Sequence, residues 1–139
     1  TDRQTNKKSY LHYFQNLIRD ELFEFCQEAQ VSCSMTDCWA VRYQKGDQQT
    51  IHNHKSWGFT GILYVDFDPK VHTPTCFVAP WQDPRSDTTT LAKPRDVKEG
   101  TIFISPSYTL HFVHPNQVRK HRTIISFDLL PKLPDHQSV

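Results

Sequence analysis

Apolar residues recur every three or four positions over the first part of the chain. Between residues 7 and 29 they are Leu11, Phe14, Ile18, Leu22 and Phe25, with polar residues between them. In an α-helix this spacing places all five side chains on one face. The pattern therefore predicts one amphipathic helix over residues 7–29, which packs through that face.

After residue 31 the pattern changes to short runs rich in β-branched and aromatic residues, separated by turn residues. Runs of this kind are typical of β-strands. They cover residues 38–44, 50–54, 59–67, 75–78, 101–105, 110–113 and 123–129. A helix followed by seven or eight short strands predicts a mainly β fold. We expect a cupin-like jelly roll, or double-stranded β-helix, with the helix on one outer face.

Two stretches show neither pattern. Residues 79–97 are rich in Pro, Asp, Thr and Arg, and we expect a long loop there, either functional or a surface insertion. The tail, residues 131–139, carries two prolines and is expected to be frayed. With a β core over about residues 37–130, the length fits one domain over residues 1–139.

Composition narrows the possible partners and the compartment. The chain has 16 Lys and Arg against 15 Asp and Glu, a balance that favours neither nucleic acid nor an anionic membrane. No apolar run approaches the roughly 20 residues that span a bilayer, and the N-terminus lacks a signal-peptide pattern. The four cysteines form no close pair, so we expect free thiols and a cytoplasmic protein. Oligomeric state has no signature in the sequence.

Three histidines are candidate metal ligands and catalytic residues. His52 and His54 are two positions apart, so on an extended strand both side chains point to the same face. His111 lies on a later predicted strand, which in a jelly roll can be a neighbour across the sandwich. Three imidazoles would leave one side of the metal open, as in non-heme iron oxygenases. A structural zinc site would instead be closed and would usually contain paired cysteines.

The residues around these histidines form an ordered pattern. In chain order it consists of R-Y-x-x-G at 42–46, H-x-H at 52–54, E-G-T-I-F at 99–103, His111, Arg122 and I-S-F-D at 125–128. Over residues 39–129 the pattern resembles the 2-oxoglutarate and Fe(II)-dependent oxygenases. The resemblance is strongest to the prolyl 4-hydroxylase-like branch and its small phage and bacterial members.

The resemblance implies an enzyme that hydroxylates a small-molecule or peptide substrate with O₂ while 2-oxoglutarate is decarboxylated to succinate. The three histidines would hold the Fe(II). Arg122 would bind the far carboxylate of 2-oxoglutarate, because a planar guanidinium can donate two parallel hydrogen bonds to it. Tyr64 would place its phenol against the same carboxylate, and Tyr43 would line the iron pocket. The primary substrate itself has no signature in the sequence.

Two positions depart from the family pattern. The family usually has an H-x-D or H-x-E motif, whereas His54 is a neutral ligand, and imidazole also suits Zn, Cu and Ni. The second is Ile124, two residues after Arg122, where some relatives carry a serine. Thr123 and Ser126 are candidate replacements, and strand alternation places only Ser126 on the face of Ile124.

The same residues also fit a second class of jelly roll. A cupin pattern matches Gly46, His52 and His54, and later Gly100, Pro106 and His111. The glutamate that cupins carry a few residues after the histidine pair is absent. A three-histidine cupin dioxygenase or isomerase is therefore one alternative, and a jelly-roll binding module without catalysis is another. The position of Arg122 and the lead-in at residues 42–46 favour the oxygenase.

Overall fold

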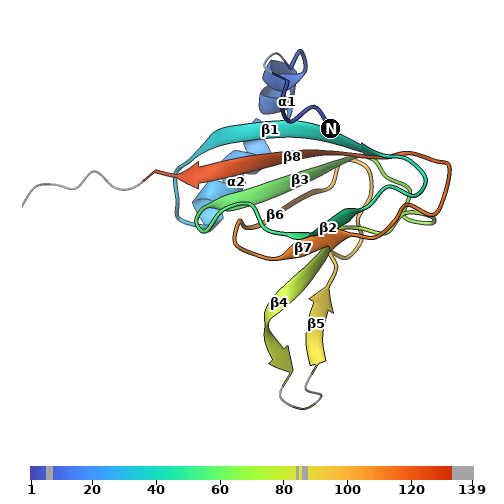
Figure 1. Cartoon of the computed structure of the whole chain (residues 1–139). Coiled ribbons are helices and arrows are strands. Elements are labelled where there is room, and N and C mark those ends of the chain that lie inside the picture. The colour runs from blue at the N-terminus through green and yellow to red at the C-terminus, as the bar shows by residue number, and fades with distance from the viewer. Residues whose placement is uncertain (6–7, 84, 86–87, 133–139) are drawn as a thin grey trace, which may run out of the picture.

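The computed structural model describes residues 1–5, 8–83, 85 and 88–132 (Figure 1). The helices are α1 (Leu11–Leu17) and α2 (Arg19–Glu28). The strands are β1 (Cys33–Tyr43), β2 (Gln49–His52), β3 (Phe59–Asp66), β4 (Cys76–Asp83), β5 (Thr88–Ala92), β6 (Ile102–Pro106), β7 (His111–Val113) and β8 (Arg122–Pro131).

The eight strands form two four-stranded antiparallel sheets. The major sheet has the order β1-β8-β3-β6, and the minor sheet has the order β2-β7-β4-β5. The chain crosses repeatedly from one sheet to the other, which is the connectivity of a jelly roll. The predicted mainly β, jelly-roll fold is confirmed.

The inner face of the major sheet follows from strand alternation. Arg122 of β8 pairs with Tyr43 of β1, and every second residue onward from each faces the minor sheet. An apolar cluster fills part of the space between the sheets, and its members include Tyr43, Ile62, Tyr64, Phe77, Val113 and Ile124. The outermost part of this space stays open as a cavity, which contains the site described below.

The outer face of the major sheet is covered by the helices, as predicted. Phe14 and Ile18 pack against Leu63 and Phe127, and the rings of Phe14 and Phe127 lie 5.5 Å apart. Gly61 of β3 lies beneath the Phe127 ring, where an added Cβ would come within 2.0 Å of a ring carbon. The sheet therefore needs glycine at this position for its packing.

The helical segment differs in extent from the single predicted helix. Two helices begin at Leu11 and Arg19, separated by Ile18, whose φ of −100° and ψ of 9° depart from helical values. Neither Pro nor Gly marks the break in the sequence. Phe14, one turn before the break, and Ile18, at the break itself, are both buried, so packing against the sheet outweighs helix continuity. The expected start at residue 7 lies outside the described residues.

The prediction of a loop over residues 79–97 is wrong for most of that stretch. β4 extends to Asp83 and pairs with β5, and the two strands project from the body as a hairpin (Figure 1). β-branched Thr88 to Thr90 suit this strand. Pro80 is tolerated because the register shifts between Val78 and Gln82.

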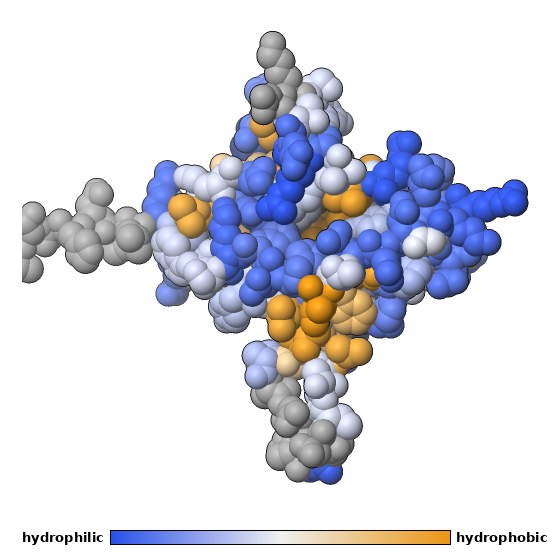
Figure 2. Space-filling model, in the orientation of Figure 1, coloured by the Kyte–Doolittle hydropathy of each residue, from blue (hydrophilic) through white to orange (hydrophobic). Residues whose placement is uncertain are grey.

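Neither described helix packs on the minor sheet. Figure 2 shows an apolar patch over the base of the β4–β5 hairpin. The strands of the minor sheet and their ends carry exposed large apolar residues, which include Ile51 of β2, Leu91 of β5 and Leu110 just before β7. No described helix is long and apolar enough to cross a membrane. The four cysteines are free thiols, while the cytoplasmic location stays a prediction. The predicted fraying of the tail concerns residues 133–139, which lie outside the described residues.

Candidate metal centre

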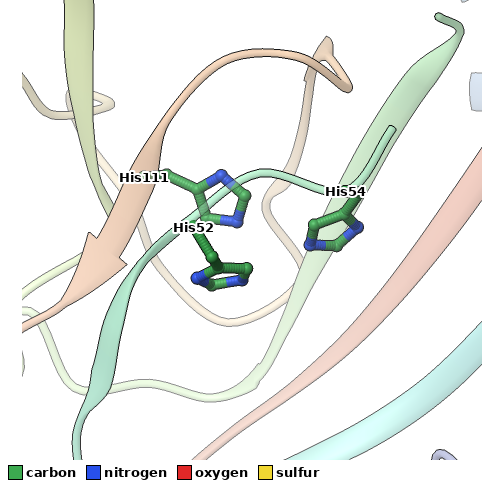
Figure 3. A group of neighbouring side chains, drawn as sticks. All are labelled: His52, His54 and His111. Carbon is green, nitrogen blue, oxygen red and sulfur yellow. The ribbon is translucent and has the colours of Figure 1, made fainter. Parts of the chain in front are cut away.

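The three predicted ligands lie close together in one cluster (Figure 3). His52 at the end of β2 lies directly opposite His111 at the start of β7. The two strands are thus neighbours in the minor sheet rather than partners across the sandwich. His54 lies two residues beyond β2, and its backbone N–H donates to the Ser107 carbonyl at 3.0 Å. One nitrogen of each imidazole can serve as a ligand atom, and these three nitrogens lie within 4.8 Å of one another.

Each of the three imidazoles uses its Nδ1 for a hydrogen bond. Nδ1 of His52 lies 2.7 Å from the Thr50 carbonyl, and Nδ1 of His111 lies 2.9 Å from the Thr109 carbonyl. Nδ1 of His54 lies 2.8 Å from Oδ1 of Asp128. Carbonyl and carboxylate oxygens only accept, so Nδ1 carries the proton in all three rings. Nε2 is therefore the nitrogen available to a metal ion. Histidines that bind a metal usually donate their other ring N–H to a carbonyl or carboxylate, as Nδ1 does here.

Burial keeps two of these rings neutral. It lowers the pKa of His52 below its usual value and lowers the pKa of His111 to about 4. Hydrogen bonds to the carbonyls of Thr50 and Thr109 act in the opposite direction but do not outweigh burial. Metal ions bind the neutral imidazole, so both rings are in the binding form at neutral pH.

Asp128 is a residue of the site to which the sequence pattern assigned no role. Its side chain is 1% exposed, and Oδ1 accepts hydrogen bonds from His54 and, at 3.0 Å, from Thr60. Burial raises its pKa, but the bonds from His54 and Thr60 and the charge of Lys55 outweigh burial, so the pKa lies below its usual value. Strand alternation from Ile124 through Ser126 would have placed Asp128 on the same face.

The histidines open into a cavity of about 350 Å³ between the sheets. Its inner part is lined by Tyr43, Ile62, Thr75, Val113, Ile124 and Ser126. Trp39 forms a wall beside His54, with 5.3 Å between the ring centroids, and the guanidinium of Arg3 covers Trp39 at 4.2 Å. No described residue of 79–97 lines this cavity.

Arg122 lies behind the inner wall and is 2% exposed. Nη2 donates to the Thr75 hydroxyl at 2.9 Å, and Thr75 itself lines the cavity. Nε and Nη1 are buried and have no hydrogen-bond partner among the described residues. Burial lowers the pKa of Arg122, although a guanidinium remains charged in proteins. A separate space of about 20 Å³ beside Arg122 is large enough for one water molecule.

The two predicted tyrosines flank this guanidinium. Its carbon lies 5.1 Å from the ring centroid of Tyr43 and 5.6 Å from that of Tyr64. Tyr43 lines the cavity, whereas Tyr64 is fully buried behind it and accepts a hydrogen bond from the Thr75 N–H at 3.2 Å. Thr75 thus joins Tyr64 to Arg122, and no motif in the sequence pointed to it.

The structure shows which side chains surround Ile124, the position where some relatives carry a serine. Ile124 and Ser126 both line the cavity, as strand alternation predicts, and Thr123 does not. Ile124 adds apolar surface to the cavity wall, two residues along β8 from Arg122. Of the two candidate replacements, Ser126 is the one whose side chain faces the cavity.

The chain belongs to a family of 2-oxoglutarate and Fe(II)-dependent oxygenases. The family whose description reads "Putative 2OG-Fe(II) oxygenase" matches residues 37–128, which include the three histidines, Arg122 and Asp128. This confirms the resemblance drawn from the ordered motifs. No curated protein matches the chain.

Solved structures of such enzymes have the same fold. A 2OG-Fe(II) oxygenase family oxidoreductase from Burkholderia pseudomallei has 15% identity and a TM-score of 0.64, over 86% of this chain and 57% of that one. A prolyl-4-hydroxylase from Pseudomonas putida has 12% identity and a TM-score of 0.60, over 91% of this chain and 70% of that one. HygX from Streptomyces hygroscopicus, crystallised with nickel and 2-oxoglutarate, has 13% identity and a TM-score of 0.64, over 87% of this chain and 67% of that one.

Proposed function

We propose that this protein is an Fe(II)- and 2-oxoglutarate-dependent oxygenase that hydroxylates a small-molecule or peptide substrate. The observation that carries the proposal is the pairing of two groups at one cavity. Three imidazoles converge at its mouth, and a buried guanidinium with two open nitrogens lies behind its inner wall. An iron ion and a dicarboxylate cosubstrate would satisfy both groups.

The histidines fit a single transition-metal ion. Nε2 of His52, His54 and His111 is free, and the three rings come from one side of the site, so the other side is open to cosubstrate and O₂. When bound, Fe(II), 2-oxoglutarate and O₂ would supply the oxidising chemistry, in which one oxygen atom of O₂ enters succinate as 2-oxoglutarate loses CO₂ and the other oxygen atom enters the substrate. The protein contributes the positions of the ligands and the electrostatics around them.

Arg122 fits the far carboxylate of 2-oxoglutarate. A buried cation with unsatisfied N–H groups is costly, and a carboxylate that reaches those groups would remove the cost. The Thr75 hydroxyl, which lines the cavity next to Arg122, would donate to the same carboxylate. The Tyr64 phenol, held by Thr75, would complete this end of the site, and Tyr43 would form its wall. HygX has the same fold and was crystallised with 2-oxoglutarate bound, which supports 2-oxoglutarate as the cosubstrate.

The substrate would bind on the other side of the metal, toward the mouth of the cavity. Trp39 and Arg3 line the mouth together with Gln48 and Gln49. These side chains offer a flat aromatic surface, a cation and amide groups. We propose that they contact the substrate and hold one of its C–H bonds beside the metal.

Thermal unfolding in the presence of ligands tests the proposal. Mn(II) or Ni(II) in place of Fe(II) should raise the melting temperature, and 2-oxoglutarate should raise it further, because a ligand that binds only the folded state stabilises it. A shift with metal but not with 2-oxoglutarate would favour the three-histidine cupin. No shift with either would favour a binding module without catalysis. In either case the oxygenase proposal would be wrong.

A further inference from the structure

Asp128 is a carboxylate that contacts the histidine cluster through its hydrogen bond with His54. We propose that Asp128 is a positioning residue, which supplies through His54 the negative charge that an Asp or Glu ligand brings in the usual H-x-D or H-x-E site. The inference rests on the proposed function, because it takes the three histidines as the ligands of a divalent metal. The negative charge that an aspartate or glutamate at position 54 would supply then comes from a residue that is not a metal ligand.

The three ligands provide an internal comparison. His52 and His111 each donate Nδ1 to the backbone carbonyl two residues earlier, and that partner is neutral. His54 alone donates to a carboxylate, which comes from β8, 74 positions away in the chain. The ligand that replaces the usual anion is therefore the one that is hydrogen-bonded to an anion.

Asp128 is placed to act on the metal through this bond. It is almost completely buried, so its charge is screened less than a surface charge would be. A hydrogen bond from a ligating imidazole to a carboxylate fixes the ring orientation and raises the basicity of the ligand. The other bond to Oδ1, from Thr60, whose hydroxyl lies 3.0 Å from that of Ser107, holds the carboxylate in position.

The second oxygen of Asp128 is free of hydrogen bonds. Oδ2 is buried, has no hydrogen-bond partner among the described residues and lies 3.6 Å from Nζ of Lys55. Lys55 is 43% exposed on its side chain, so water screens this ion pair and it offsets only part of the charge. Most of the charge of the carboxylate remains available to a cation held by His54.

The test is the affinity of the whole chain for Mn(II) and Co(II), measured by titration calorimetry without 2-oxoglutarate. Asp128→Asn keeps an oxygen that accepts from His54 and Thr60 and removes the charge. We expect about a 10- to 100-fold loss of affinity. Asp47→Asn is the matched control, since Asp47 also lines the cavity but accepts from the Gln44 N–H, and its affinity should equal that of the unmodified protein.

A second pair of variants separates charge from a merely structural role. His54→Asp returns an anionic ligand to the metal, so the carboxylate at 128 is no longer needed. In the His54→Asp background, Asp128→Asn should cost less than twofold in affinity. An equal loss in both backgrounds would overturn the inference, because it would show that Asp128 only supports the fold. The unfolding free energy of each metal-free variant, from urea titration, shows whether it is folded.

Lys55→Gln gives an independent result with the opposite sign. Its removal leaves the Asp128 charge unshared, so metal affinity should rise about two- to fivefold, the range of a partly exposed ion pair. Unchanged or weaker binding would contradict the proposal, even if Asp128→Asn failed to fold. Absence of metal binding by the unmodified protein would refute the proposed function itself. Binding by the unmodified protein that Asp128→Asn leaves within twofold would refute only the inference.

Discussion

The two ends of the cavity satisfy their polar atoms in different ways. At the histidine end, Nδ1 of every ring has a partner within the protein, so each ring is held with Nε2 free. At the arginine end, two nitrogens of Arg122 have no partner among the described residues. Buried polar groups are nearly always paired, so these two nitrogens are open to an acceptor such as the carboxylate proposed above. The protein itself holds the three rings at the histidine end, whereas at the arginine end the proposed cosubstrate would supply the missing hydrogen-bond acceptor.

The largest expected effect is at the histidine end. His111→Ala removes one of three ligands, so its loss of Mn(II) affinity should exceed the 10- to 100-fold cost of changing a ligand's hydrogen-bond partner. Conversion of 2-oxoglutarate to succinate should stop. His114→Ala is the matched control, since His114 is exposed and lies just after β7. Full turnover by His111→Ala would show that the ligand assignment is wrong.

The same end should make the metal-free protein sensitive to acid. The folded-state pKa of His111, about 4, lies below the ordinary value of 6.5, so the unfolded chain takes up a proton first as pH falls. The stabilisation is complete above pH 6.5 and is lost between pH 6.5 and 4, by on the order of 3 kcal/mol. Urea unfolding at pH 7 and pH 4 measures the loss. His111→Gln should reduce it, and an unchanged loss would contradict the pKa shift.

At the arginine end, Arg122→Gln should act on 2-oxoglutarate and not on the metal. A charge-assisted hydrogen bond contributes on the order of 2–3 kcal/mol, so the Kd of 2-oxoglutarate for the Mn(II)-loaded protein should rise roughly 30- to 150-fold. Titration calorimetry gives both affinities. Arg122→Lys keeps the charge but not the planar guanidinium, so its Kd for 2-oxoglutarate should lie between those of the unmodified protein and Arg122→Gln. An unchanged Kd would show that the open nitrogens face only the small separate space.

A substitution away from both ends should leave both affinities unchanged. Gly61→Ala pushes a Cβ into the Phe127 ring on the helix-covered face of the major sheet. Overpacking of this kind should lower the unfolding free energy by about 1–3 kcal/mol. Metal and 2-oxoglutarate affinities of the folded variant should match those of the unmodified protein. A loss of either affinity would mean that packing on the outer face of the major sheet affects the two ends of the cavity.

The sequence predicted correctly those features that depend on regular spacing or on an ordered set of motifs. Strand alternation placed Ser126 with Ile124, and the ordered pattern of histidines and Arg122 indicated the family. The helix that covers the major sheet was found from its apolar spacing, although the break at Ile18 depends on packing that the local sequence does not encode. The hairpin was missed because Pro and Asp suggest a loop, whereas register shifts allow Pro80 within a strand.

Residues that contact the predicted site residues, without themselves belonging to a motif, could not be predicted from the sequence. Asp128 and Thr75 bind no metal in this account, and each is one ordinary residue in a strand or beside one. Their importance comes from contacts with His54 and Arg122, which lie 74 and 47 positions away in the chain. A single sequence gives no sign of such pairings, whereas the structure shows them directly.

The most direct measurement is a crystal structure of the protein soaked with Mn(II) and 2-oxoglutarate. The account predicts one anomalous peak at coordination distance from Nε2 of His52, His54 and His111. It also predicts that the far carboxylate of 2-oxoglutarate is hydrogen-bonded to Nε or Nη1 of Arg122. A metal bound through other atoms, or a 2-oxoglutarate whose carboxylate leaves both nitrogens of Arg122 unpaired, would contradict the account.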